Sequence, residues 1–360
     1  MKSSLVLASR GLGNTAPNPS VGCLLVKEGI VVAQSYTNVG GRPHAETQAL
    51  KIAQHLAKGA TAYITLEPCA HKNNGLSCAQ QLVDYGIKRA VIAMEDPDPR
   101  TSGKGIKLLT ENNIDVNLGV CEKMAYRINY GHICRFRYDR PSVSLKTASS
   151  LDGRIALSSG ESKWITGDLA RRHVHLIRSY HDAVLVGIDT VKKDDPMLNC
   201  RLRGVEKFSP RRIILDSNLS ISLESKLVKS AKEIPLSIVA REKVNTDKKK
   251  ELIFKGVDVI EVTEDFNSKL DLHILLKILS KKGITRLLVE GGSKINASFV
   301  SLGLVDEIYC YRSGMLIGNE GYSSIFNLAI DKLSLVPKYE LLEQKKLGDD
   351  LLDIWTKKSY

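Results

Sequence analysis

The chain has 360 residues, a formal net charge of +12 and 43% hydrophobic residues, and this length predicts two or three domains. No apolar run approaches 18 residues, which argues against a membrane partner, and the apolar run at residues 5–8 is too short for a secretory signal. The positive charge is not gathered into one arm. Its densest run, at residues 248–250, lies in a polar stretch at 241–250 that we interpret as a solvated loop, so we expect no nucleic-acid partner.

The first part of the chain alternates strands with helices, which predicts an α/β layered domain with a largely parallel sheet. A hairpin is indicated by Glu28-Gly29 between two apolar runs. In chain order we expect a helix at 3–10, strands at 21–26 and 30–34, a helix at 44–58, a strand at 62–66, a helix at 79–85, a strand at 90–94, a helix at 104–112, a strand at 114–118 and a helix at 121–137.

A second α/β unit is expected after a linker at residues 139–141, which gives domains 1–139 and 140–360. Asp168 is expected to cap a helix that runs to about residue 180, and residues 187–196 are expected to form a long loop. The remaining elements are strands at 144–149, 183–186, 212–215, 236–239, 257–262, 286–289, 305–311, 339–342 and 351–355, with helices at 272–279 and from 293.

The chemistry of the first domain is indicated by His44-Ala45-Glu46, Pro68-Cys69 and Cys78. One imidazole and two thiols can supply three of the four tetrahedral positions of zinc, and an open fourth position is typical of a catalytic site. Glu46 is left as a free carboxylate that can carry a proton from water to a leaving amine. Known zinc deaminases have this constellation with their second cysteine three residues after the first, whereas here it follows nine residues later. The alternative is a core histidine with two unrelated buried cysteines.

The compartment is indicated by the cysteines. Seven cysteines at irregular spacing, two of them assigned to a metal, are typical of a reducing cytoplasm, where we expect the protein to act.

Several segments together resemble the bifunctional riboflavin-biosynthesis deaminase-reductases. The resemblance covers nearly the whole chain and rests on the order of the motifs as much as on each one. The matching segments are Pro17-Asn18-Pro19, Pro43-His44-Ala45-Glu46, Thr65-Leu66-Glu67-Pro68-Cys69, residues 93–99, Ser150-Leu151-Asp152-Gly153-Arg154, residues 160–166, Asp194-Asp195-Pro196, Leu288-Val289-Glu290-Gly291-Gly292 and residues 303–307.

The resemblance implies two consecutive reactions on a small phosphorylated pyrimidine. A cytidine-deaminase-like three-layer domain would remove an amine with zinc held by His44, Cys69 and Cys78 and with Glu46 as proton donor. A dihydrofolate-reductase-like domain would then use NADPH to reduce the ribosyl group to ribityl, and we expect a homo-oligomer. The positions that match the family's NADPH contacts are Ala148, Trp164, Thr190, Asp194, Ser217, Gly291 and Gly292, and those that match its substrate contacts are Ser162, Arg178, Leu198, Arg201 and Glu290.

Read one at a time, these reductase residues have simpler roles. Gly291-Gly292 is more often only a turn, Trp164 a core aromatic, Asp194 part of a solvated turn and Arg178 a charge near a helix end. Only their joint occurrence favours a cofactor site.

One departure from the family lies between the two cysteines, where its usual Gly-Arg-Thr-Pro-Pro run is replaced by residues 72–77. A basic residue that could hold the substrate is therefore displaced or supplied by Lys72.

Two other functions compete with this interpretation. One is a tRNA or nucleobase deaminase with an accessory nucleic-acid-binding domain, but the second half lacks an aromatic and basic platform. The other is a zinc-stabilised binding protein, which would have no use for Glu46.

Overall fold

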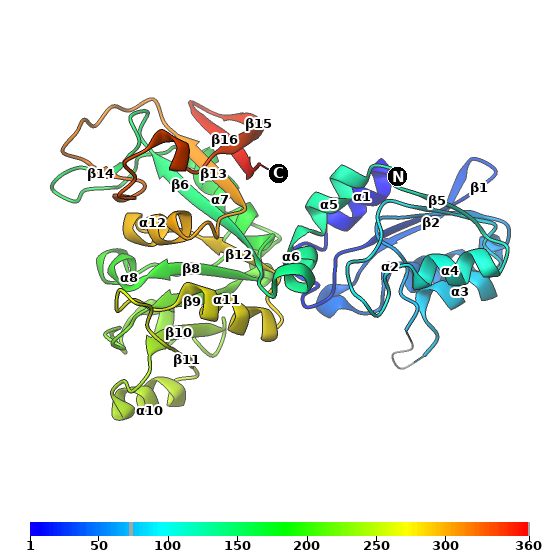
Figure 1. Cartoon of the computed structure of the whole chain (residues 1–360), viewed down its shortest axis with the longest axis horizontal. Coiled ribbons are helices and arrows are strands. Elements are labelled where there is room, and N and C mark those ends of the chain that lie inside the picture. Colours follow the sequence, from blue (N-terminus) through cyan, green and yellow to red (C-terminus); the bar gives the residue numbers. More distant parts are fainter. Residues whose placement is uncertain (72–74, 359–360) are drawn as a thin grey trace. The chain divides into compact units, whose positions relative to one another are not determined.

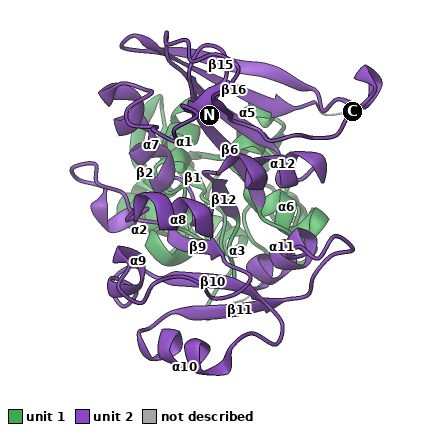
Figure 2. Ribbon diagram, turned by 90° about the vertical axis from the view of Figure 1, so that its left-hand side faces the viewer, with its two compact units in different colours: residues 1–141, 283–285 green, residues 142–282, 286–360 purple. Residues whose placement is uncertain are grey.

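The computed structural model of the chain describes residues 1–71 and 75–358. It divides into two compact units, one of residues 1–141 with 283–285 and the other of residues 142–282 with 286–360 (Figure 2).

The first unit is built on a five-stranded sheet with the order β2-β1-β3-β4-β5. Its strands are β1 (Gly22–Lys27), β2 (Ile30–Tyr36), β3 (Thr61–Ile64), β4 (Arg89–Ile92) and β5 (Asp115–Leu118). The predicted hairpin is present, since Glu28 and Gly29 both have positive φ, as a two-residue turn of this kind requires. The sheet is mixed rather than largely parallel, because this hairpin makes β1 antiparallel to β2 and to β3, while β3, β4 and β5 run parallel.

Helices cover both faces of this sheet (Figure 1). α1 (Lys2–Ser9) packs with α5 (Glu122–Ile128) on one face, and α2 (Ala45–Ala53), α3 (Cys78–Asp84) and α4 (Lys104–Glu111) pack on the other. The unit also has α6 (Tyr130–Tyr138) and the 3-10 turns η1 (Val39–Gly41) and η2 (Gln54–Ala57). Its core lies between the layers and includes Leu25, Leu50, Ile64, Ile92 and Leu109. The three layers are those expected for the first domain.

Two helix predictions in this unit are wrong in extent. The helix expected at 44–58 ends at Ala53, because Gln54 has a φ of +50° and the chain continues as a 3-10 turn. The helix expected at 121–137 is two helices. The Asn129 side chain donates to the carbonyl of Ala125 at 3.0 Å, and Asn129 itself leaves the helical conformation, so it competes with the helical ladder at the break.

The second unit is built on a nine-stranded sheet with the order β11-β10-β9-β8-β12-β6-β13-β16-β15. The strands from β11 to β13 are all parallel, and β16 and β15 add an antiparallel edge. The strands are β6 (Ser142–Ser149), β8 (Ala183–Gly187), β9 (Arg211–Leu215), β10 (Leu236–Arg241), β11 (Asp258–Val262), β12 (Arg286–Val289), β13 (Glu307–Arg312), β15 (Tyr339–Leu347) and β16 (Asp350–Lys357), with β7 (Arg154–Ala156) and β14 (Tyr322–Ser323) as a separate pair. The carboxyl ends of parallel strands share one edge, which is where open α/β sheets bind ligands.

The helices of this unit connect the parallel strands. They are α7 (Asp168–Ser179), α8 (Ile188–Asp194), α9 (Lys226–Lys229), α10 (Thr246–Phe254), α11 (Leu272–Lys281) and α12 (Ser293–Ser301), with 3-10 turns η3 (Glu206–Phe208) and η4 (Leu333–Leu335). Three expectations need correction. The long loop at 187–196 is mostly α8, in which Asp189 lies in the first turn and Lys192 and Lys193 lie in the last, as the helix dipole favours. The residue that caps α7 is Gly167 and not Asp168, which is the first residue of the helix. The expected solvated loop at 241–250 contains the start of α10, where the Asn245 side chain caps the helix by accepting two backbone N–H bonds.

Among residues 1–71 and 75–358, no helix combines the length and the apolar character of a membrane span.

Candidate functional site

The three predicted zinc ligands meet in the first unit. The Nδ1 atom of His44 lies 3.2 Å from the Sγ atom of Cys78 and 3.7 Å from that of Cys69, and all three ligand atoms lie within 4.8 Å of one another. A tetrahedral zinc ion with ordinary bond lengths would separate such nitrogen and sulfur atoms by about 3.6 Å. The donor set and its spacing therefore fit one zinc ion.

The ligands converge because three chain segments begin or end at the same sheet edge. His44 is the residue before α2, in an extended conformation, rather than in the first turn of the helix as expected. Cys78 is the first residue of α3, whose start is fixed by the Ser77 side chain accepting from the backbone N–H of Gln80. Cys69 lies in the loop that follows β3. Two helix N-termini thus face the cluster, where their dipoles favour thiolates.

The pKa values of the two thiols are shifted in opposite directions. Hydrogen bonding from Cys78 and then from His44 lowers the pKa of Cys69 to about 4 although burial opposes this change. The pKa of Cys78 is raised, through its hydrogen bond to Cys69 and through burial. Metal binding would require both thiols to lose their protons.

Glu46 lies in the first turn of α2, beside these ligands. Its side chain is buried, and its Oε2 atom has no hydrogen-bond partner among the described residues. Burial raises its pKa to about 7, and Cys69 adds to the effect whereas His44 opposes it. An unpartnered buried carboxylate oxygen is costly unless water or a ligand completes it, so this arrangement fits a site that holds a reacting water molecule.

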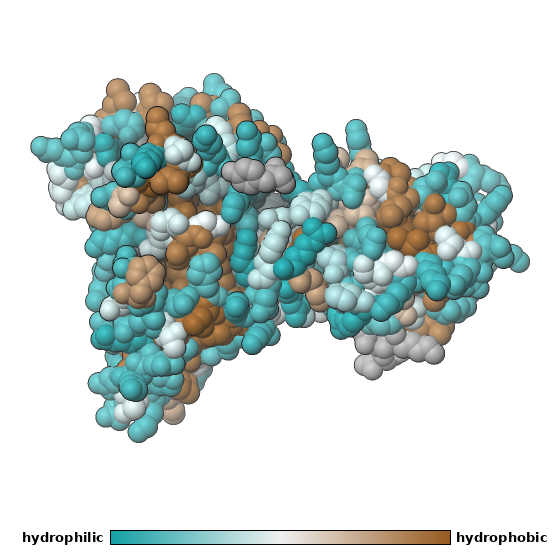
Figure 3. Space-filling model, in the orientation of Figure 1, coloured by the Kyte–Doolittle hydropathy of each residue, from teal (hydrophilic) through white to brown (hydrophobic). Residues whose placement is uncertain are grey.

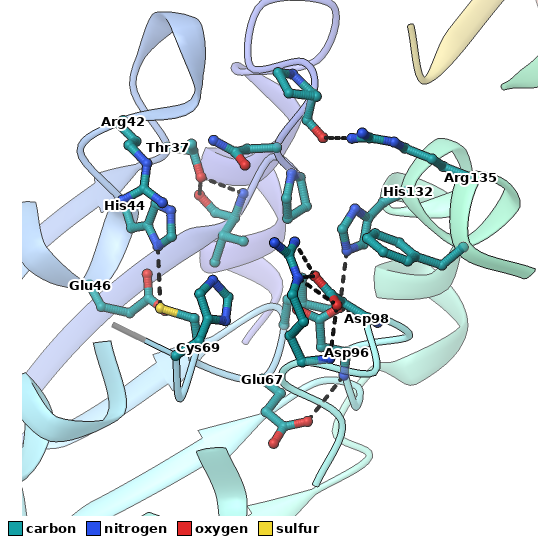
Figure 4. A pocket seen from close by; sticks show the side chains of 18 residues that line it. Thr37, Arg42, His44, Glu46, Glu67, Cys69, Asp96, Asp98, His132 and Arg135 are labelled. Carbon is teal, nitrogen blue, oxygen red and sulfur yellow. Dashed lines mark hydrogen bonds and ion pairs between the residues drawn. The ribbon is translucent and has the colours of Figure 1, made fainter. Parts of the chain in front are cut away.

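The cluster opens into a pocket lined by both charged and apolar side chains (Figure 4). The metal ligands His44 and Cys69 lie at one side of it together with Glu46. The other lining residues are Pro17, Asn18, Pro19, Val21, Thr37, Arg42, Leu66, Glu67, His71, Asp96, Asp98, Arg100, His132, Arg135 and Phe136.

Glu67 was not predicted to have a role, yet it organises this pocket. Its buried carboxylate accepts backbone N–H bonds from Asp96 at 3.2 Å, Gly103 at 3.0 Å and Ile106 at 3.1 Å. It therefore holds both ends of the segment 96–103 and the first turn of α4. Glu67 stands two residues before Cys69, so the segment is fixed relative to the ligand loop.

A buried histidine and a buried aspartate contact each other in the same pocket. His132 Nε2 lies 3.0 Å from Asp96 Oδ1, and both side chains are less than a tenth exposed. The His132 ring packs edge-on against Phe136, with ring centroids 4.9 Å apart. No sequence pattern indicates this pair, because its members are 36 residues apart.

In the second unit, several predicted cofactor residues lie at the carboxyl edge of the parallel strands. Ala148 lies near the end of β6, Ser217 follows β9, and Gly291 and Gly292 follow β12. Gly292 faces Thr190, since a Cβ atom on Gly292 would lie 3.7 Å from Thr190 Oγ1, and the carbonyl of Gly291 accepts a backbone N–H from Gly187 at 3.1 Å. The glycine turn thus approaches the start of α8 closely.

Two of the predicted substrate residues bind each other. Arg178 Nε and Nη2 donate to the two carboxylate oxygens of Glu290 at 2.5 and 2.8 Å, and Nη1 donates to the carbonyl of Asn199 at 2.9 Å. Both side chains are largely buried. Burial raises the pKa of Glu290, but Arg178 outweighs this effect and brings the pKa to about 2, so the pair is ionised at neutral pH.

The other predicted reductase residues are more dispersed. Trp164 is 65% exposed and lies under the guanidinium of Arg171, so it is not a core aromatic. Asp194 and Arg201 are exposed, Ser162 is half-buried, and Leu198 is buried with a positive φ.

Lys146 was missed. It lies in the middle of β6, and its pKa is lowered by burial, with Arg178 adding to the effect and Glu290 opposing it. A lysine within a strand of small and apolar residues was the available signal. Lys72, expected to replace the family's basic residue, lies outside the described residues.

Comparisons with known proteins match both units of the chain. A family model of the RibD C-terminal domain matches residues 141–352, and a model of the cytidine and deoxycytidylate deaminase zinc-binding region matches residues 1–94. The riboflavin biosynthesis protein RibD of Aquifex aeolicus is 40% identical over 352 residues, which cover 98% of this chain and 96% of that relative. The protein of the same name from Escherichia coli is 35% identical over 98% of this chain and 96% of its own length.

Solved structures of similar proteins also match nearly the whole chain. Acinetobacter baumannii RibD is similar with a TM-score of 0.89 at 36% identity, covering 99% of this chain and 98% of that one. A diaminohydroxyphosphoribosylaminopyrimidine deaminase/5-amino-6-(5-phosphoribosylamino)uracil reductase from Thermotoga maritima has a TM-score of 0.86 at 32% identity, with 99% and 97% coverage. These likenesses confirm the expected α/β fold of both halves.

Proposed function

Because the chain belongs to the RibD family of bifunctional riboflavin-biosynthesis enzymes, we propose that His44, Cys69 and Cys78 hold its zinc ion and that Glu46 carries the proton in its deaminase reaction. The enzyme combines a zinc-dependent deaminase with an NADPH-dependent reductase. We propose as its substrate 2,5-diamino-6-(5-phosphoribosylamino)pyrimidin-4-one, in agreement with the name of the Thermotoga maritima relative.

The observation that carries the residue assignment is the unpartnered Oε2 atom of Glu46 beside three converging metal ligands. A structural zinc site has four protein ligands and no adjacent orphaned carboxylate. Three ligands with such a carboxylate suit hydrolysis instead.

The chain's own groups account for the proton transfers of this reaction. A bound zinc ion would supply Lewis-acid activation of water. Glu46 accepts a proton from the attacking water and donates it to the amino group as the carbon–nitrogen bond breaks, so that oxygen replaces nitrogen on the ring and ammonia leaves. The buried position of Glu46 keeps bulk water from competing for that proton.

Metal analysis of Cys78→Ser tests the ligand set. We expect strong loss of zinc, because a serine hydroxyl is a poor substitute for a thiolate. Cys121→Ser is the matched control, since Cys121 lies in the same unit outside the cluster and should leave the zinc content unchanged. Full zinc retention in Cys78→Ser would remove Cys78 from the site.

For the reductase half, we propose that NADPH binds along the carboxyl edge of the parallel strands. The support is the position of the glycine turn after β12 against Thr190, with Ala148 and Ser217 at the ends of neighbouring strands. Trp164 and Asp194 complete the proposed cofactor set, and both are exposed. The proposed substrate set is Ser162, Arg178, Leu198, Arg201 and Glu290.

We propose that the deaminase occupies residues 1–139 and the reductase residues 140–360. The division of the chain into two compact units supports this assignment. Separately expressed halves should each retain their own reaction. An insoluble C-terminal half beside a soluble N-terminal half would contradict the independence of the two.

The remaining assignments concern the compartment, the partners and the oligomeric state of the enzyme. We propose a cytoplasmic enzyme, supported by seven free cysteines, and one without a nucleic-acid partner. We also propose a homo-oligomer, supported by exposed apolar side chains on the edge strand β15 and in the turn η4 before it, among them Leu333, Leu335 and Leu341. Figure 3 shows brown apolar atoms among teal ones on the part of this unit that carries β14 and β15 in Figure 1. Light scattering of the purified chain gives its mass directly.

A further inference from the structure

The deaminase pocket contains an ion pair that has no part in metal binding or in proton transfer. Arg100 Nε donates to both carboxylate oxygens of Asp98 at 3.0 and 2.9 Å, and its Nη2 donates to Oδ2 at 2.5 Å. The Asp98 side chain is 5% exposed, whereas that of Arg100 is 64% exposed. One edge of the guanidinium is thus fixed by a buried carboxylate, and Nη1 on the other edge has no hydrogen-bond partner among the residues described.

This pair is built on a rigid segment. Asp98 Oδ1 accepts the backbone N–H of Arg100 at 2.9 Å, and the backbone N–H of Asp98 donates to Asp96 Oδ1 at 2.9 Å. The carbonyl of Asp98 accepts from Thr101 and Ser102, which closes the turn. Glu67 holds the segment at both ends, as described above. The position of Arg100 relative to the metal ligands is therefore set by consecutive hydrogen bonds rather than by the arginine side chain alone.

The pocket is lined by three arginines and by four carboxylates, those of Glu46, Glu67, Asp96 and Asp98. Its cationic lining residues are Arg42, Arg100 and Arg135. Arg42 lies close enough to His44 to oppose the rise of its pKa, which places Arg42 near the metal ligands, as Figure 4 also shows. Arg135 Nη1 donates to the carbonyl of Pro17 at 2.9 Å. Of the three, Arg100 is the one that a buried carboxylate holds with an open edge.

We propose that Arg100 binds the phosphate group of the deaminase substrate and that Asp98 positions it. This inference rests on the proposed function of the pocket, because a substrate whose amine lies at the metal must place its ribosyl phosphate elsewhere in the same pocket. A guanidinium can donate from one edge to a carboxylate and from the other to phosphate oxygens, which gives the contact a direction as well as a charge. The segment between the two cysteines need not then supply the phosphate-binding cation.

The test compares two substrates with two variants of the full-length zinc-loaded enzyme. Arg100→Gln should raise the deaminase KM for the phosphorylated substrate about ten- to hundredfold, the usual effect of losing a hydrogen bond between charged groups. The zinc content should be unchanged, and kcat should change much less than KM. Asp98→Asn, which releases the anchored edge of Arg100, should give a smaller rise of the same kind. With the dephosphorylated substrate, wild type and both variants should have the same KM.

A direct binding measurement uses ribose 5-phosphate as a competitive inhibitor. Its inhibition constant should weaken in Arg100→Gln by the same factor as KM, and Arg100→Lys should restore part of the affinity. Arg89→Gln is the matched control, since Arg89 is also exposed and paired with an aspartate, Asp115 at 3.4 Å, but begins β4 at the opposite end from the pocket. This control should leave both KM and the inhibition constant unchanged.

The outcomes separate this inference from the proposed function. If wild type shows no zinc-dependent deamination, the proposed function fails. If wild type is active but Arg100→Gln leaves KM unchanged, or raises KM equally for both substrates, Arg100 does not bind the phosphate and the inference is overturned.

Discussion

Replacing Arg178 by methionine should destabilise the second unit by about 3 kcal/mol, because it leaves Glu290 buried without its partner. The Glu290 pKa of about 2 lies 2.5 below its ordinary value of 4.5. At about 1.4 kcal/mol for each pKa unit, the folded state gains roughly 3 kcal/mol at neutral pH from keeping this carboxylate ionised. Burial opposes the shift and would act alone on Glu290 in the variant, whereas the variant also removes the burial cost of Arg178. Removing one member of a buried ion pair typically costs about 3–5 kcal/mol.

The assay is denaturant unfolding followed by tryptophan fluorescence. Both tryptophans, Trp164 and Trp355, lie in the second unit, so the signal reports on that unit alone. Removing both charges in Arg178→Met/Glu290→Gln should recover most of the loss, because no unpaired buried charge remains.

The pH dependence follows from the same pair. A depressed carboxylate pKa contributes stability above about pH 4.5 that is lost as the pH falls toward 2, so wild type and Arg178→Met should converge over that window. A loss below about 1 kcal/mol at neutral pH, or a double variant no more stable than the single one, would refute this role of the pair.

Three further predictions concern single residues. Arg201→Ala should raise the reductase KM for the phosphorylated substrate about ten- to hundredfold with NADPH affinity unchanged, and equal harm to the dephosphorylated substrate would contradict a phosphate contact. His181 is buried neutral with a pKa lowered to about 3, mainly by burial and then by Arg286. Wild-type stability should therefore fall by roughly 4–5 kcal/mol as the pH drops from 6.5 toward 3, and His181→Gln should flatten that slope in the same fluorescence assay. Gly22→Ala should shorten the half-life of the deaminase activity on heating but not that of the reductase activity. The added Cβ atom would lie 1.9 Å from the carbonyl oxygen of Ser4, and such an overlap typically costs about 1–3 kcal/mol. A deaminase half-life equal to that of wild type would mean that α1 shifts without cost.

The metal centre could be predicted from the sequence because its parts are local. His44 and Glu46 are two residues apart at a helix start, and Cys69 follows a strand whose end faces that helix. The element types therefore bring the ligands to one sheet edge without any knowledge of distant contacts. The hairpin at Glu28-Gly29 was predictable for the same reason.

Other features could not be predicted, because they depend on contacts between residues far apart in the chain or on a side chain that competes with the backbone. Glu67 binds backbone N–H groups 29 to 39 residues away, and nothing in its own neighbourhood indicates that it is buried. Arg178 and Glu290 were each assigned to the substrate from the family motifs, but their pairing across 112 residues appears only in the fold. The break at Asn129 depends on a side chain that competes with the backbone, which helical periodicity does not detect.

The most direct test of the proposed deaminase mechanism is the rate of Glu46→Gln in a preparation whose zinc content and reductase rate are also measured. Glutamine keeps the shape of the side chain but cannot carry the proton. We therefore predict full zinc, an unchanged reductase rate on the deaminated substrate, and a deaminase rate lower by at least about 10²–10⁴-fold. A zinc-loaded Glu46→Gln enzyme that deaminates at the wild-type rate would contradict the central claim.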